Sequence, residues 1–235
     1  MKEERPWLFI LSLILPGLAI FLTFAFYPVT DALIGSLFDW YRFSRGQFVG
    51  IQNYIQVVNS YEFLNISNLL SFEFPMGAFP QNLIWMVIHV PLSMFLGLGI
   101  ALLLQDLKGA FLIRSCVFIG MVTPLVVVGI LFLFLYDPQA GLANAFLRTI
   151  GLGAFAQDWL SNPQVAIFAL ILGGVWVQTG FSLLLYSSAL TTVPDELIDA
   201  ASVDGASPWQ RFRHVIWPSL KPTTMTGLLM GWYGY

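Results

Sequence analysis

The sequence predicts an all-α fold, a polytopic bundle of membrane-spanning helices, and three observations support this prediction. Lys and Arg number 10 and Asp and Glu 13, so 10% of the 235 residues are charged, against about 25% in soluble domains. Hydrophobic residues make up 57% of the chain, and 21 residues are Phe. Several stretches stay apolar over the ~20 residues that a helix needs to cross the hydrocarbon. The bilayer is therefore the solvent that fits this composition.

The same composition argues against other classes of protein. A net charge of −3 without a basic cluster does not suit a nucleic-acid-binding protein. The single cysteine, Cys116, cannot form an internal disulfide, and His89 and His214 lie too far apart in the sequence to suggest a metal site. No GxxxxGK[ST] phosphate-binding motif occurs. We therefore expect no cofactor, no metal and no catalytic residues.

Four complete spans are predicted along the chain. At a rise of ~1.5 Å per residue, each reaches at least about 30 Å, the thickness of the hydrocarbon. Lys2 and Arg5 before the first stretch would also fit a signal peptide, but the apolar run is longer than the usual ~7–15 residues. The four predicted spans are residues 7–26, 82–104, 111–135 and 165–190.

A partial fifth helix is predicted after Pro222. Residues 223–235 would form only about 20 Å of helix, which is too short to cross the bilayer. From this we expect a single transmembrane domain over residues 1–235 that is truncated at its C-terminus.

The distribution of basic residues predicts a cytoplasmic N-terminus. In that orientation, seven of the Lys and Arg residues lie inside and three lie outside, namely Arg42, Arg45 and Arg148. This asymmetry satisfies the positive-inside rule. We therefore expect a multi-pass protein of the cell (inner or plasma) membrane.

Two connections are predicted on the outer side. Residues 27–81 are too many for a simple turn, and their aromatic-rich part, Phe38 to Tyr54, is expected to lie along the membrane surface. Residues 136–163 carry several Gly and Pro and are expected to contain a short amphipathic helix.

The inside loop, residues 191–221, shows the clearest local signals. Thr192 followed three residues later by Asp195 fits a capping box at a helix start. Gly205 fits a helix stop, because glycine takes the left-handed conformation at little cost.

A second short helix is predicted directly after this stop. Ser207 is a suitable cap, Pro208 fits the first turn, and Pro218 is expected to end the helix. Two capped helices joined at a glycine indicate a rigid, protruding surface that binds a partner. The alternative is an ordinary structured loop, which any membrane protein can carry.

The residues of this loop resemble a known motif. The stretch from Asp199 to Gly205, followed by Val215 to Pro218, resembles the EAA loop of ABC importer permeases. The longer pattern ELxEAAxxDGAsxWQxFRxxxxP matches from Glu196 to Pro218 without a gap, with Asp199 where the motif has Glu. Further resemblance, as in Phe48 to Tyr54, points to the carbohydrate-type branch.

This resemblance implies a function and a set of partners. It implies the permease subunit of an ATP-driven, binding-protein-dependent importer for a sugar or sugar-like solute, with a six-helix core. Such a permease pairs with a second permease subunit, two cytoplasmic ATP-binding subunits that supply the ATP hydrolysis, and an extracytoplasmic solute-binding protein. The ATPase-coupling residues would be Glu196, Asp199, Ala200, Ala201, Asp204, Gly205, Arg213 and Pro218.

Substrate contacts are predicted in the fourth span. Gly174, Gln178 and Phe181 share one helical face, and an amide at bilayer depth is costly unless it faces a cavity or a partner. The alternative is interhelical packing, in which small and polar residues are common. His89 is expected to be packed or helix-bonded, not a proton carrier.

Two other functions compete with the importer. One is a truncated remnant that does not transport. The other is a secondary transporter, which would need ionisable groups within its spans, and the predicted spans contain almost none.

Overall fold

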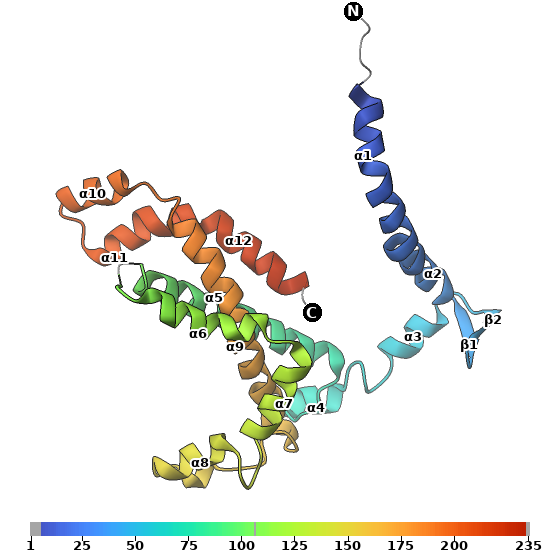
Figure 1. The fold of residues 1–235 in the computed structure, drawn as a ribbon. Coiled ribbons are helices and arrows are strands. Elements are labelled where there is room, and N and C mark those ends of the chain that lie inside the picture. Colours follow the sequence, from blue (N-terminus) through green and yellow to red (C-terminus); the bar gives the residue numbers. More distant parts are fainter. Residues whose placement is uncertain (1–5, 106, 234–235) are drawn as a thin grey trace, which may run out of the picture. The chain divides into compact units, whose positions relative to one another are not determined.

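The computed structural model describes residues 6–105 and 107–233 (Figure 1). Apart from one two-stranded hairpin, the regular elements of these residues are helices, so the predicted all-α class is confirmed. The chain divides into two compact units, one ending at Asn65 and the other beginning at Ile66. Within the described residues, three helices are long and apolar enough to cross a membrane, and one bent pair would make a fourth span.

The first unit begins with one long helix that passes through a proline. It consists of α1 (Pro6–Phe21), a π-helical turn (Leu22–Phe26) and α2 (Tyr27–Gly35). The apolar segment Phe9–Gly35 spans 27 residues, so the first span continues well beyond its predicted end at residue 26.

The π-helical turn explains this difference. Pro28 lacks an N–H, and in a regular helix its ring would press on the carbonyl four residues back. The wider turn just before it lets Tyr27 N–H bond the Leu22 carbonyl five residues back and relieves that contact. The helix therefore continues to Gly35.

A hairpin follows the long helix. Strands β1 (Phe38–Tyr41) and β2 (Ser44–Phe48) pair antiparallel, with Phe38 opposite Phe48 and Tyr41 opposite Ser44. Helix α3 (Gln52–Val58) comes next, and its Asn53 amide donates to the carbonyls of Ser36 (2.9 Å) and Phe38 (2.8 Å). The sequence analysis did not predict strands in this segment.

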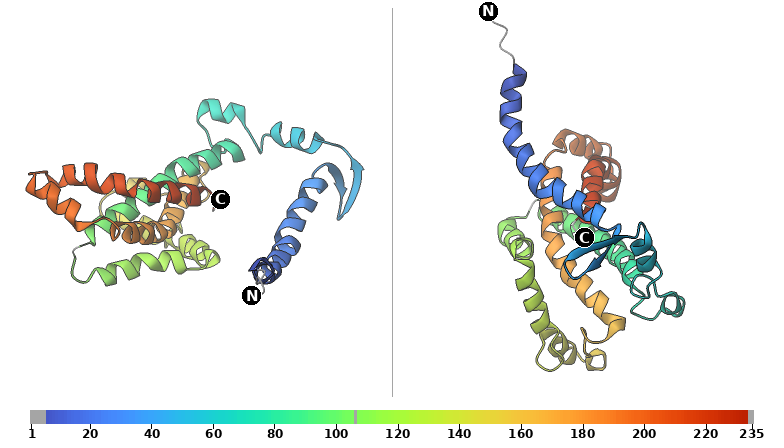
Figure 2. Two further views of the ribbon diagram at one scale, coloured as in Figure 1. Left: turned by 90° about the horizontal axis from the view of Figure 1, so that it is seen from above. Right: turned by 90° about the vertical axis from the view of Figure 1, so that its right-hand side faces the viewer.

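The second unit is built around two long helices. After α4 (Ile66–Ser71), α5 (Ala78–Leu103) and α9 (Pro163–Leu190) confirm the second and fourth predicted spans to within a few residues at each end. They cross at Gly97, where an added Cβ would lie 2.4 Å from the Ser182 Cβ. Figure 2 shows α6 and α12 beside this pair. The buried core of the pair comprises Val90, Met94, Leu98, Ala101, Leu183, Tyr186, Leu190 and Leu220.

The third predicted span, residues 111–135, is not one straight helix. Helix α6 (Ala110–Val122) and helix α7 (Leu125–Leu135) meet at an angle of 104°. Thr123 is extended (φ −76°, ψ 128°), as expected for a residue before proline, and Pro124 cannot supply a helical N–H. The prediction of one continuous helix was wrong here. It relied on the long apolar run and did not take the Thr123-Pro124 break into account.

The connection between α7 and α9 contains the expected short amphipathic helix, α8 (Leu142–Thr149). A short 3-10 turn (Gly153–Phe155) follows it. The buried Asn144 holds the connection together, since its amide donates to the Gln157 carbonyl (2.9 Å) and accepts from Trp159 Nε1 (2.8 Å). Further along, the backbone N–H of Ser161 donates to Asp158 and lowers the pKa of that carboxyl.

The chain ends in two helical segments that follow α9. Helix α10 (Asp195–Val203) is short, whereas α11 (Pro208–Arg211), a π-helical turn (Phe212–Ile216) and α12 (Trp217–Tyr233) run on without interruption. Pro218 was expected to end the helix and does not. A π-helical turn again directly precedes the proline, as it does before Pro28, and lets the helix continue.

Candidate functional site

The first candidate site is the elbow, which we define as α10 and α11 with the turn between them. Helix α10 begins at Asp195, with Pro194 as its N-cap residue and no side-chain cap. Thr192 instead donates its hydroxyl to the Ala189 carbonyl (2.7 Å), so the predicted Thr192 capping box is wrong. Asp195 and Glu196 still occupy the first turn, where the helix dipole favours negative charge.

Gly205 stops α10 as predicted. Its φ is +78°, in the left-handed region that glycine adopts at little cost. The Gly205 N–H donates to the Ser202 carbonyl (3.1 Å), and the Ala206 N–H donates to the Ala201 carbonyl (2.9 Å). These two bonds form a Schellman motif, which satisfies the last carbonyls of the helix and fixes the direction in which the chain leaves it.

Helix α11 begins with the predicted cap. Gln210 N–H donates to Ser207 Oγ (3.3 Å), and Ser207 N–H donates to Gln210 Oε1 (2.7 Å), which completes a capping box. Arg211 donates from Nη1 to Ser202 Oγ (2.9 Å) and so ties α11 back to α10. The sequence analysis missed this tie, because it joins two residues across the turn and no local pattern marks it.

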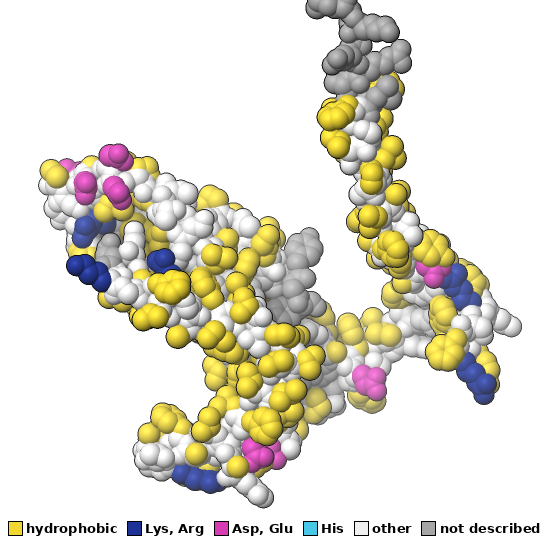
Figure 3. Space-filling view, viewed as in Figure 1, with side chains coloured by type: hydrophobic (Ala, Val, Ile, Leu, Met, Phe, Trp, Pro, Cys, Tyr) yellow, Lys and Arg dark blue, Asp and Glu magenta, His cyan; other side chains and the backbone are white. Residues whose placement is uncertain are grey.

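The outer surface of α10 is exposed and carries both acidic and apolar side chains. Figure 3 shows acidic side chains gathered over α10, with basic side chains beside them. The predicted members Glu196, Asp199, Ala200, Asp204 and Gly205 are all exposed, and Ala201 is half-buried. Three large apolar side chains that were not predicted are also exposed: Leu197, Val203 (88% exposed) and Trp209. Large apolar side chains exposed together in this way are typical of an interaction surface.

Two predicted coupling residues lie elsewhere. Arg213 lies in the π-helical turn and lines a groove of about 500 Å³ together with Trp209, Trp217 and the end of α5 near Leu102. Pro218 is exposed in the first turn of α12. The structure therefore places these two residues on the continuous helix that leaves the elbow, and the other predicted members on or next to α10.

The second candidate site is a cavity between α5, α7 and α9. It has a volume of about 470 Å³, within the ~300–1,000 Å³ typical of ligand pockets. Gly174 lines it, as do Asn82 and Trp85 of α5, which the sequence analysis did not assign to a pathway. The remaining lining residues are apolar: Leu125, Val128, Gly129, Phe132, Leu170, Gly173 and Val177.

The three predicted substrate residues do not share this cavity. An added Cβ at Gly174 would lie 3.0 Å from His89 Cδ2, so Gly174 lets α9 approach α5 closely. Gln178 and Phe181 are half-buried and do not line the cavity. His89 is buried and hydrogen-bonds the backbone of Gly174, as a packed histidine would.

In the part of the chain that the structure describes, no three His, Cys, Asp or Glu side chains come together. The elbow presents exposed acidic and apolar side chains, and the cavity has an apolar wall with one amide and one indole.

Comparison with known proteins points to one family. Residues 90–234 match the family described as binding-protein-dependent transport system inner membrane component. A probable ABC transporter permease protein of Pyrococcus horikoshii is 41% identical over 97% of this chain and 76% of its own length. The trehalose/maltose transport system permease protein of Thermococcus litoralis is 32% identical over 93% of this chain and 70% of its own length.

Solved structures show the same fold. A chain of a bacterial ABC transporter involved in the import of the acidic polysaccharide alginate matches with a TM-score of 0.73 at 22% identity, covering 97% of this chain and 73% of that chain. A second structure of the alginate transporter, in complex with a periplasmic protein that holds an alginate pentasaccharide, matches with a TM-score of 0.75 at 22% identity, covering 97% of this chain and 72% of that chain.

Proposed function

The chain belongs to the family of binding-protein-dependent transport system inner membrane components, and we propose that its elbow is the surface through which a cytoplasmic ATPase drives it. As a member of this family, the chain is a membrane permease subunit of an ABC importer and not an enzyme. The remaining questions are how it couples to ATP hydrolysis, what it carries and how it lies in the membrane.

The rigidity of the elbow is the observation that supports coupling. The Schellman motif at Gly205, the capping box at Ser207 and the tie from Arg211 to Ser202 hold α10 and α11 at a fixed angle. A displacement of α10 would therefore move α11 with it, because no flexible joint separates the two helices. Because α11 continues into α12, which packs on α5 and α9, the push reaches the helices that line the cavity.

The partners and the orientation follow from this role. In this proposal the elbow faces the cytoplasm. Counting the bent α6–α7 pair as one span gives four crossings, which would put the N-terminus on the same side as the elbow, in line with the positive-inside distribution. Two ATP-binding subunits would hold the elbows of this chain and of a second permease subunit, and a solute-binding protein would deliver the solute on the opposite side.

A sugar or sugar-like solute fits the cavity best. The Trp85 indole can stack on the apolar face of a sugar ring, and the Asn82 amide can hydrogen-bond its hydroxyls. Curated relatives include the trehalose/maltose permease and an alpha-glucoside transport system permease protein of Rhizobium meliloti. Gln178 and Phe181 remain proposed contacts further along α9, together with Gly174 at the cavity.

Co-purification tests the coupling surface. The chain is expressed with its ATPase, and Val203→Glu places a charge on the exposed apolar surface of the elbow. We expect the tagged variant to retain little ATPase and to lose ATP-dependent uptake of labelled trehalose or maltose. Phe155→Glu is the control, because Phe155 is also exposed but lies in the connection before α9. Equal ATPase recovery with both variants would exclude the elbow as the docking surface.

A further inference from the structure

The hairpin in the first unit presents an exposed aromatic surface outside both candidate sites. Residues 38–48 form this hairpin, and all of its strand residues except Phe38 are exposed. At its tip, Phe43 is 99% exposed and Tyr41 is also exposed, and Phe48 is exposed at the other end of the hairpin. The Arg42 guanidinium lies 5.6 Å from the centre of the Tyr41 ring. Aromatic side chains gathered on an exposed turn indicate an interaction surface.

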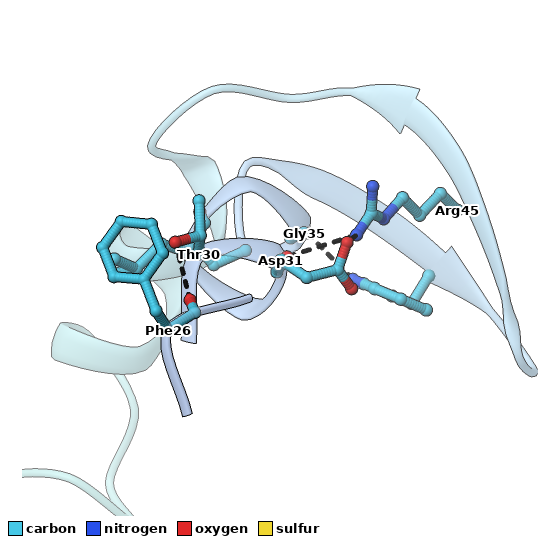
Figure 4. A network of polar contacts seen from close by, with 8 residues as sticks. Phe26, Thr30, Asp31, Gly35 and Arg45 are labelled. Atoms are coloured by element: carbon cyan, nitrogen blue, oxygen red, sulfur yellow. Dashed lines mark hydrogen bonds and ion pairs between the residues drawn. The ribbon is translucent and has the colours of Figure 1, made fainter. Parts of the chain in front are cut away.

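The hairpin is fixed to the end of the long apolar helix. Trp40 Nε1 donates to the Gly35 carbonyl (2.9 Å), and Arg45 forms an ion pair with Asp31 and also donates to its backbone carbonyl (3.2 Å). Figure 4 shows the Arg45 side chain reaching from the second strand to Asp31 on α2. An added Cβ at Gly35 would lie 3.0 Å from the Trp40 ring, so the strand lies close against the helix.

The length of the helix places the hairpin at the edge of the bilayer. The 27 residues of Phe9–Gly35 extend about 40 Å at ~1.5 Å per residue, whereas the hydrocarbon is about 30 Å thick and the headgroups extend it to about 40–45 Å. The hairpin begins three residues after this helix ends. A rigid connection of that length leaves the hairpin in the headgroup layer.

The composition of the tip fits lipid. Trp and Tyr prefer the membrane–water interface, where the ring meets apolar groups and its polar atom meets water. Arg42, in the turn between the two strands, has a left-handed backbone (φ 58°), which is unfavourable for a residue other than glycine. A cation beside exposed rings is complementary to anionic headgroups.

We propose that the hairpin of residues 38–48 is an interfacial anchor whose aromatic tip enters the lipid headgroup layer. Through Trp40 and Arg45, the anchor fixes the depth of the first membrane-spanning helix in the bilayer. This role differs from that of a segment that lies loosely on the surface. Because the hairpin is joined to the helix, the position of the tip also sets how deeply the helix lies in the bilayer. The proposal does not depend on the identity of the solute or on the coupling surface.

Depth measurement with a spin label tests the anchor. The full chain, with Cys116→Ser, is placed in nanodiscs of phosphatidylethanolamine and phosphatidylglycerol, and a single nitroxide is attached at Phe43→Cys. We expect the label to be relaxed more by oxygen, which concentrates in lipid, than by a water-soluble nickel complex. Tyr61→Cys is the matched control, since Tyr61 is 79% exposed in the same unit but lies outside the hairpin, and its label should favour the nickel complex.

Two results would overturn the anchor. One is a Phe43 label as accessible to the nickel complex as the Tyr61 label, which would leave the tip in water. The other is a Phe43 label that becomes immobile only when the solute-binding protein is added, which would make the tip a protein-docking surface.

The attachment of the hairpin to the helix has its own test. In the Phe43→Cys background, Asp31→Asn removes one partner of the ion pair. We expect the mobility of the label to rise severalfold while the helix stays in the membrane. Unchanged mobility would show that the Asp31–Arg45 pair does not hold the hairpin.

Discussion

Gly205 is one of the residues that set the angle of the elbow. An added side chain there would meet no neighbouring atom within 4 Å, so space is not the constraint. The constraint is the backbone, because a non-glycine residue at φ +78° costs roughly 1–2 kcal/mol and a β-branched one more.

We therefore expect Gly205→Val to uncouple the importer. The strained residue should move toward an ordinary φ, open the Schellman motif and change the angle between α10 and α11. In proteoliposomes, ATP hydrolysis should continue while sugar uptake per ATP falls severalfold. Gly205→Asn is the control, since Asn tolerates the left-handed region better than other side chains, and it should retain coupling. Uptake per ATP unchanged in the Val variant would remove Gly205 from the mechanism.

Ser207 stabilises the start of α11 through its hydroxyl. Ser207→Ala should weaken the cap by about 1 kcal/mol, which corresponds to roughly a fivefold change in the local opening equilibrium. Amide hydrogen exchange over residues 207–211 should quicken by that factor. Ser207→Thr keeps the hydroxyl and should exchange nearly as slowly as the unchanged protein, and equal exchange in the Ala and Thr variants would contradict the role of the cap.

At the scale of elements, the crossing of α5 and α9 depends on close approach. An added Cβ at Gly97 would lie 2.4 Å from Ser182 Cβ and 2.8 Å from the Leu183 backbone nitrogen, so the two helices touch through their backbones there. Small residues at such crossings are what allow packing in lipid, where no hydrophobic force draws the helices together.

Gly97→Ala should therefore destabilise the bundle. Forcing an extra methyl group into this crossing should cost about 1–3 kcal/mol, seen as a lower midpoint of thermal unfolding in detergent. Gly99→Ala lies on the same helix with nothing within 4 Å, and it should leave the midpoint unchanged or raise it slightly. Equal midpoints for the two variants would mean that α5 and α9 do not meet as described.

At the scale of the whole molecule, the proposed orientation would put the elbow on the cytoplasmic side and the connection between α7 and α9 on the outer side. We expect single cysteines at Val203 and Phe155, both exposed, to differ in labelling by a membrane-impermeant maleimide in intact cells. In the Cys116→Ser background, Phe155→Cys should react from outside, whereas Val203→Cys should react only after the membrane is opened. The reverse pattern would place the elbow outside and refute the cytoplasmic N-terminus.

Local sequence was sufficient wherever a structure depends on a few neighbouring residues. The Gly205 stop, the Ser207 capping box and the second and fourth spans were predicted because each arises from side chains acting on the backbone nearby or from one long apolar run. The EAA-like pattern was noticed through its resemblance to a family motif, since its residues are contiguous from Glu196 to Pro218, and its coupling role is a proposal.

Other features depend on residues far apart in the sequence or on competing local effects, and only the tertiary structure revealed them. An ion pair between Arg45 and Asp31 joins the hairpin to α2. The cavity brings Asn82 and Trp85 of α5 near Gly174 of α9. The passage of helices through Pro28 and Pro218 depends on π-helical turns. Local propensity predicted that the helix would end at Pro218. In the structure the helix continues, and α12 packs on α5 and α9. Sequence thus determined the Gly205 stop, the Ser207 cap and the second and fourth spans, because each depends on neighbouring residues or on one apolar run. Tertiary structure decided which helices continue past a proline and which residues enclose the cavity, because those features depend on packing between distant segments.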